Sequence, residues 1–134
     1  MALVLVVFAI AFLSLLAVTM FDQATTDLTI LRNHTSGLTA LYAAQAGIAD
    51  AILSVRAVPA TGIPVSGWLP MPDGTTCGYS ATIVNQCPVV TITSTGTAIG
   101  FTRRVRAVIV VAGPPALAPY PVQIVKWQEV VGAG

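Results

Sequence analysis

The chain has 134 residues, of which 55% are hydrophobic and only 8% are charged, and its formal net charge is +1. This length allows one domain together with a long helix. Soluble proteins normally carry about 25% charged residues. We therefore expect a subunit that covers much of its surface with copies of itself; the alternative is a weakly charged extracellular domain. No basic tract favours a nucleic-acid site, and we interpret the cluster of Arg103, Arg104 and Arg106 as a solvated strand face.

The stretch from Met1 to Phe21 contains no charged residue. As an α-helix it would be roughly 31 Å long, which matches the hydrocarbon core of a bilayer at about 30 Å. Its only polar side chains, Ser14 and Thr19, can hydrogen-bond to carbonyls of the same helix. Because it is apolar on all sides, this helix must lie in lipid or among other apolar helices.

Three interpretations of this segment are open. A cleaved signal peptide needs a basic start and an apolar core of about 7–15 residues, but the first basic residue is Arg32 and the apolar run is longer. An ordinary membrane anchor should have flanking positive charge. The third interpretation, which we favour, is that a short basic leader has been removed and the apolar helix is the mature N-terminus.

Residues 22–56 are expected to continue the helix as an amphipathic segment, because the first proline of the chain is Pro59. Apolar residues recur at spacings of three, four and seven. We expect this stripe to pack on a C-terminal domain; it comprises Leu28, Leu31, Leu38, Leu41, Tyr42, Ile48, Ile52 and Val55. The prediction is one helix over about residues 1–55, weakest at the Thr-rich step from Ala24 to Thr29. The alternative is two helices with a break near 22–27.

Residues 57–76 are rich in proline and glycine and are expected to form a loop. Trp68 lies in this loop, and we expect it to anchor the loop on the core rather than on a neighbouring molecule. Residues 77–134 are expected to form a β domain, because alternating runs typical of strands cover Tyr79–Val84, Val89–Thr95 and Phe101–Val111. A last strand is expected at Val122–Val130, after a Pro-rich turn. Gly96 and Gly100 are expected to separate strands. Three or four antiparallel strands packed on the long helix give an α+β fold.

The only two cysteines, Cys77 and Cys87, flank the first of these strands and are predicted to form a disulfide that closes a small loop. The single histidine, His34, is expected at a solvent-exposed or interface position. The chain has no paired carboxylates, phosphate-binding loop or nucleophile motif. We expect no enzyme activity, no cofactor and no metal site.

Several segments of the chain resemble type IV pilin-like proteins, in particular the PilX-like group of minor pilins and pseudopilins. The resemblance comes from ALVLVVFAIAFLSLLAV at residues 2–18, AAQAGIADA at 43–51, VTITSTGTAIGFTRRVRAVIVV at 90–111 and KWQEV at 126–130. It implies a leader cut by a prepilin peptidase, methylation of the amine of Met1, and assembly of the N-terminal helices into a filament core. Two positions depart from the pattern: Leu5 stands where most pilins carry glutamate, and Asp22 stands where a proline is usual.

We therefore expect a structural subunit of an extracellular type IV pilus-like filament that leaves the bacterial inner membrane on assembly, with itself and other pilins as partners. Adhesion, motility and DNA uptake are the roles that the resemblance implies. Core packing is assigned to Ala2, Leu5, Phe8, Ala9, Phe12 and Leu16. The alternatives are a minor or tip pseudopilin of a type II secretion system, and a monomeric, membrane-anchored periplasmic binding module.

Overall fold

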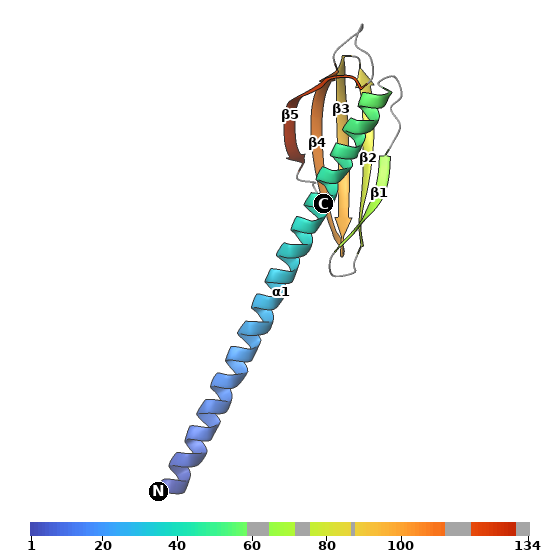
Figure 1. Ribbon diagram of the computed structural model, residues 1–134. Helices are drawn as coiled ribbons and strands as arrows, with labels where there is room; N and C mark the ends of the chain where they lie inside the picture. The colour runs from blue at the N-terminus through green and yellow to red at the C-terminus, as the bar shows by residue number, and fades with distance from the viewer. Residues whose placement is uncertain (59–64, 72–75, 87, 112–118, 131–134) are drawn as a thin grey trace. The chain divides into compact units, whose positions relative to one another are not determined.

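The computed structural model describes residues 1–58, 65–71, 76–86, 88–111 and 119–130. It contains one helix, α1 (Ala2–Ala57), and five strands (Figure 1): β1 (Val65–Pro70), β2 (Thr76–Gln86), β3 (Val89–Ala98), β4 (Phe101–Val111) and β5 (Val122–Val130). The chain divides into two compact units, Met1–Thr35 and Ser36–Gly134. The second unit holds all the described strands and the C-terminal part of α1.

The predicted α+β fold is confirmed, with one long helix and an antiparallel sheet, but the sheet has five strands in the order β1-β2-β3-β4-β5 instead of three or four. The additional strand, β1, lies in the segment predicted to be a loop. Its six residues pair with β2 from Val65↔Ala81 to Pro70↔Thr76. Proline is tolerated here because β1 is an edge strand and Pro70 ends it.

Helix α1 is helical at every residue through the Thr-rich step, so the alternative of two separate helices is wrong. The hydroxyls of Thr25 and Thr26 donate to the carbonyl of Asp22 at 2.8 and 2.9 Å, and that of Thr29 donates to the carbonyl of Thr25 at 2.9 Å. These polar side chains are thus satisfied by the helix itself.

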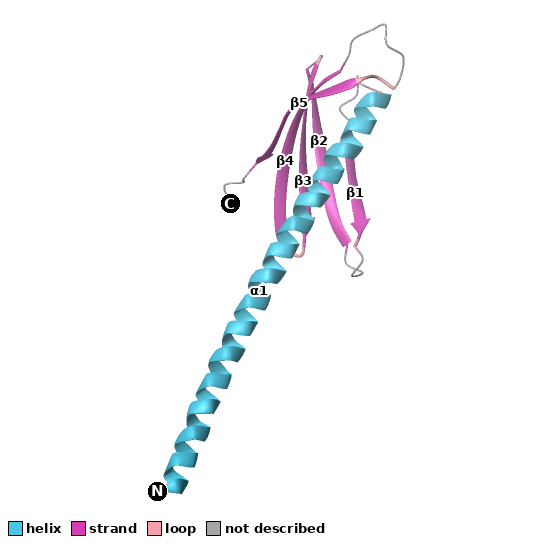
Figure 2. Cartoon of the chain, turned by 60° about the vertical axis from the view of Figure 1, so that its left-hand side comes forward, coloured by secondary structure: helices cyan, strands magenta, loops and turns pink. Residues whose placement is uncertain are grey.

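The C-terminal part of α1, from Ser36, crosses one face of the sheet, and no described segment covers the opposite face (Figures 1 and 2). The predicted alternation in β2, β3 and β4 is confirmed. Ala81, Ile92 and Ala107 are fully buried toward the helix, whereas the threonines of β3 and Arg104 and Arg106 of β4 point the other way. Strands β3 and β4 are joined by Ile99 and Gly100, both with positive φ (44° and 79°), which is the backbone of a tight type I′ hairpin turn.

The helix contacts the sheet mainly through small residues. The predicted stripe is only partly right. Ile48 and Val55 are buried, and Leu41 and Ile52 are partly buried against the core, whereas Leu28, Leu31, Leu38 and Tyr42 are exposed. The buried positions instead include Gly37, Ala40, Ala43, Ala44, Gly47 and Ala51. Alanine and glycine give a weak hydrophobic signal in the sequence, but they allow the helix to lie close to the strands.

Gly96 marks the closest approach of the helix to the sheet. It lies inside β3, which corrects the prediction that it separates two strands. A Cβ at this position would meet the carbonyl oxygen of Ala40 and the amide nitrogen of Ala44, which are backbone atoms of α1. Only glycine fits between the strand and this part of the helix.

Candidate functional site: the exposed apolar surface of the helix

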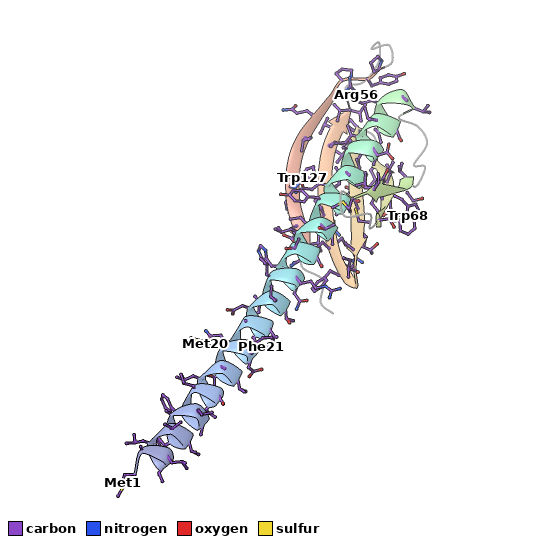
Figure 3. All side chains as sticks on the ribbon, turned by 60° about the horizontal axis from the view of Figure 1, so that its bottom comes forward. Met1, Met20, Phe21, Arg56, Trp68 and Trp127 are labelled. Carbon is purple, nitrogen blue, oxygen red and sulfur yellow. The ribbon has the colours of Figure 1, made fainter. Side chains whose placement is uncertain are left out.

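The strongest candidate site is the surface of α1 itself. Every residue from Met1 to Thr35 is exposed, and side chains stand out on all sides of the helix in this part of the chain (Figure 3). The large residues predicted to pack in a filament core have high exposed fractions: Leu5 72%, Phe8 73%, Phe12 57% and Leu16 44%. The two small ones, Ala2 and Ala9, are also exposed.

These predicted core residues share one side of the helix. Ala2, Leu5, Ala9, Phe12 and Leu16 follow one another at steps of three and four, the spacing that places side chains along one stripe. The opposite side is equally apolar, since Val7 and Ile10 are 58% and 59% exposed. The surface is therefore suited to lipid or to apolar helices approaching from any direction.

The polar groups inside the apolar stretch have partners within the helix. Ser14 Oγ donates to the carbonyl of Ile10 at 2.8 Å, and Thr19 Oγ1 donates to the carbonyl of Leu16 at 2.9 Å. At its start, the amide of Leu5 donates to the carbonyl of Met1 at 3.3 Å. By length and composition, α1 is able to cross a membrane. Leu5 has no carboxylate that could pair with an amine.

Apolar exposure does not end at Phe21, and the sequence did not reveal this. Leu28, Ile30 and Leu31 in the first unit are 61–65% exposed. In the second unit, Leu38, Tyr42 and Leu53 remain 40%, 62% and 61% exposed on the side of α1 that faces away from the sheet. One signal in the sequence is that apolar residues continue past Asp22, Asp27 and Arg32. Their periodicity predicts a face that packs on the C-terminal domain, but Leu38 and Tyr42 lie on the opposite face.

Cys77 carries a free thiol and is 2% exposed. Its Sγ donates to the carbonyl of Leu69 at 3.6 Å. Cys87 lies outside the described residues, but it directly follows Gln86, the last residue of β2, whereas Cys77 is the second residue of that strand. An extended segment of this length spans about 30 Å, and the Cα atoms of a disulfide lie about 4.4–6.8 Å apart. The predicted disulfide within one chain is therefore corrected, because β2 continues through the segment expected to form a closed loop.

Trp68 also corrects a prediction. Its side chain is 74% exposed on β1 and does not anchor that segment in the core. Instead Tyr79 fills the space between sheet and helix, where its hydroxyl donates to Asp50 Oδ2 at 2.9 Å. This hydrogen bond, together with burial and the charge of Asp50, raises the pKa of Tyr79 above its ordinary value of 10.0.

Within the described residues, no group of three or more histidine, cysteine, aspartate or glutamate side chains could hold a metal ion. His34 is exposed on α1. No protein-family model matches the chain, and neither a curated protein nor a solved structure matches it.

Proposed function

We propose that this chain is a structural subunit of an extracellular filament of the type IV pilus kind. Residues 1–21 hold the subunit in the bacterial inner membrane before assembly and lie in the filament core afterwards. The observation that carries this proposal is the all-round apolar exposure of α1 over Met1–Phe21, together with the exposed apolar residues that continue along α1 beyond a bilayer's length. The sheet domain then coats the shaft.

An exposed apolar helix of this size needs a non-aqueous environment. Leaving one large apolar side chain in water rather than burying it costs about 1.5–3 kcal/mol. Lipid supplies that environment for Met1–Phe21, which matches the hydrocarbon thickness. Neighbouring copies of the same helix supply it equally well, because helices associate in apolar surroundings through close packing of small and branched side chains.

The exposed residues beyond Phe21 favour a filament over a simple anchor. Asp22, Asp27 and Arg32 place the following residues outside the hydrocarbon layer. Leu38, Tyr42 and Leu53 are 40–62% exposed, so in a simple membrane anchor these large apolar side chains would remain in contact with water. In a helical polymer, the outward side of α1 is covered by neighbouring subunits, so the same residues acquire partners.

The test compares substitutions at two positions of the full chain in its host cell, with filaments sheared from the surface and imaged by electron microscopy. Phe12→Asp should abolish filaments, whereas Phe12→Leu should keep them. Leu53→Asp should lower the filament yield at least tenfold while the subunit stays in the membrane fraction; Leu53→Met should assemble normally. The anchor alternative expects no effect at Leu53, because that residue would lie in water in any case.

Wild-type filament yield from Leu53→Asp, or a wild-type chain found only as monomers dispersed by detergent, would contradict the proposal. A density map in which the N-terminal helices lie at the periphery of the filament would do so as well.

A further inference from the structure

The face of the sheet opposite the helix carries two rows of polar side chains, most of them hydroxyls, beside the exposed valines Val84 and Val89. Residues paired across neighbouring strands share one face, so the register shows which side chains line up. One row runs Ser66, Ser80, Thr95 and Arg104, and the next runs Thr82, Thr93, Arg106 and Gln128. Each row crosses four strands and includes one arginine of β4.

Most of these groups are free to bind another molecule. Thr82 Oγ1 donates to the carbonyl of Thr93 at 3.2 Å, and Thr97 Oγ1 donates to that of Gly78 at 3.4 Å. Ser66, Ser80 and Thr95 have no hydrogen-bond partner for their hydroxyls among the residues that the structure describes. A hydroxyl both donates and accepts, so this array matches a ligand that is itself rich in hydroxyls.

All the charged side chains that the structure describes on this face are basic. Arg104, Arg106 and Lys126 are exposed on it and form no ion pair within the described part of the chain. Glu129, the one acidic residue of the described strands, lies on the helix side, because it pairs in register with the buried Val105. Its carboxylate forms an ion pair with Arg103 Nη1 at 3.2 Å. A guanidinium without a partner is suited to bind carboxylate or phosphate through paired hydrogen bonds.

An exposed aromatic ring lies at one end of the array. The indole of Trp68 lies over Gly78, its partner on β2. A Cβ added at Gly78 would stand 3.0 Å from Cζ3 and 3.3 Å from Cε3 of the indole, so the missing side chain makes room for the ring. A shallow groove beside it is lined by Ser66, Ser80, Thr95 and Thr97. The indole is 74% exposed and offers a flat apolar surface next to polar groups, as ligand sites commonly do.

We propose that this face binds an acidic polysaccharide. A sugar ring stacks on Trp68, sugar hydroxyls bond to the serine and threonine rows, and carboxylates pair with Arg104, Arg106 and Lys126. From β1 to β5 the face spans about 19 Å, at about 4.8 Å per strand, so it accommodates an oligosaccharide segment. Hydroxyls outnumber cations on this face, which favours a glycan over single-stranded nucleic acid, whose binding depends mainly on phosphate charge and several stacking rings.

The proposal does not depend on filament formation, and its test uses the full chain as monomers in detergent micelles. The probes are oligogalacturonate, a neutral galacto-oligosaccharide of similar length and oligo-dT, with affinities measured by titration calorimetry. We expect oligogalacturonate to bind at least tenfold more tightly than the neutral sugar and more tightly than oligo-dT. Its affinity should fall as salt is raised, because the charged groups are exposed.

The chain offers matched controls on the two faces of the sheet. The double variant R104Q/R106Q should lower the oligogalacturonate affinity at least tenfold, whereas R103Q on the helix side should change it less than twofold. Likewise Trp68→Ala should weaken binding at least fivefold, whereas Trp127→Ala, on the other edge strand (Figure 3), should not. Circular dichroism checks that each variant is folded.

A loss per removed charge that is as large in R103Q as in R104Q/R106Q would overturn the proposal, since net charge alone would then explain binding. Tighter binding of oligo-dT would assign the face to nucleic acid instead, and no binding of any probe would remove the site. None of these results bears on assembly, which is measured separately by filament yield.

Discussion

The close approach of α1 to the sheet makes Gly96→Ala a sharp test of the packing. A Cβ at Gly96 would lie well under 3.0 Å from the carbonyl oxygen of Ala40 and the amide nitrogen of Ala44, and 3.0 Å from the carbonyl carbon of Ala43. The helix backbone cannot rotate away, so the whole C-terminal segment of α1 must move off the strands. Such overpacking costs about 1–3 kcal/mol, and we take about 3 because the obstacle is backbone. Replacing a strand glycine by alanine returns about 0.5–1 kcal/mol. The net expected loss is about 2 kcal/mol.

The measurement is urea unfolding of the full chain in detergent micelles, followed by the fluorescence of Trp68 and Trp127, which both lie on strands. Gly78→Ala is the matched control on the open face. Its Cβ would stand 3.0 Å from the end of the exposed Trp68 ring, which can tilt away. The gain of about 0.5–1 kcal/mol for replacing a strand glycine by alanine is then not outweighed, so Gly78→Ala should not be less stable than wild type. If Gly96→Ala is as stable as Gly78→Ala, the backbone of α1 at Ala40 and Ala44 does not lie this close to β3.

Two further outcomes follow from the same interface. Ile48→Ala removes a side chain that is 0% exposed and should cost about 3 kcal/mol of unfolding free energy. Leu53→Ala, on the side of α1 that faces away from the sheet, should cost less than about 0.5 kcal/mol in micelles. Similar losses in the two variants would contradict the assigned faces of the helix. The raised pKa of Tyr79 means that the folded chain keeps this proton to a higher pH than the unfolded chain, so the stabilisation is full below pH 10 and falls as pH rises above it. Tyr79→Phe should therefore be less stable than wild type by about 1 kcal/mol at pH 8, with the gap narrowing above pH 10 in urea titrations; a constant gap would contradict the Asp50 contact.

The sequence predicted well those elements in which a regular pattern coincides with a clear boundary. The bounds of β4 and β5 match the predicted runs, Phe101–Val111 and Val122–Val130. The long helix was predicted correctly because no proline interrupts it. In each case the local preference and the tertiary structure require the same conformation.

The wrong predictions share a different physical cause: the conformation at these positions is set by partners that are distant in the sequence. Strand β1 forms because β2 offers it a ladder of hydrogen bonds, although its glycine and its proline predict a loop. Gly96 reads as a strand end, yet it serves the helix contact. Cys77 and Cys87 are close in sequence, but an extended strand separates them. No local pattern contains this information.

The two sides of α1 between Ser36 and Ala57 bear on the proposed function most directly. A helix that only had to cover the sheet would place its largest apolar residues inward and polar ones outward. Here the inward side combines glycine and alanine with only two fully buried large residues, Ile48 and Val55, while Leu38, Tyr42 and Leu53 face away from the sheet. The small residues keep the inner contact close, and the outer side keeps side chains large enough to fill the space to another helix. Such a division suits a helix with two packing partners, the sheet of its own chain and the helices of neighbouring subunits.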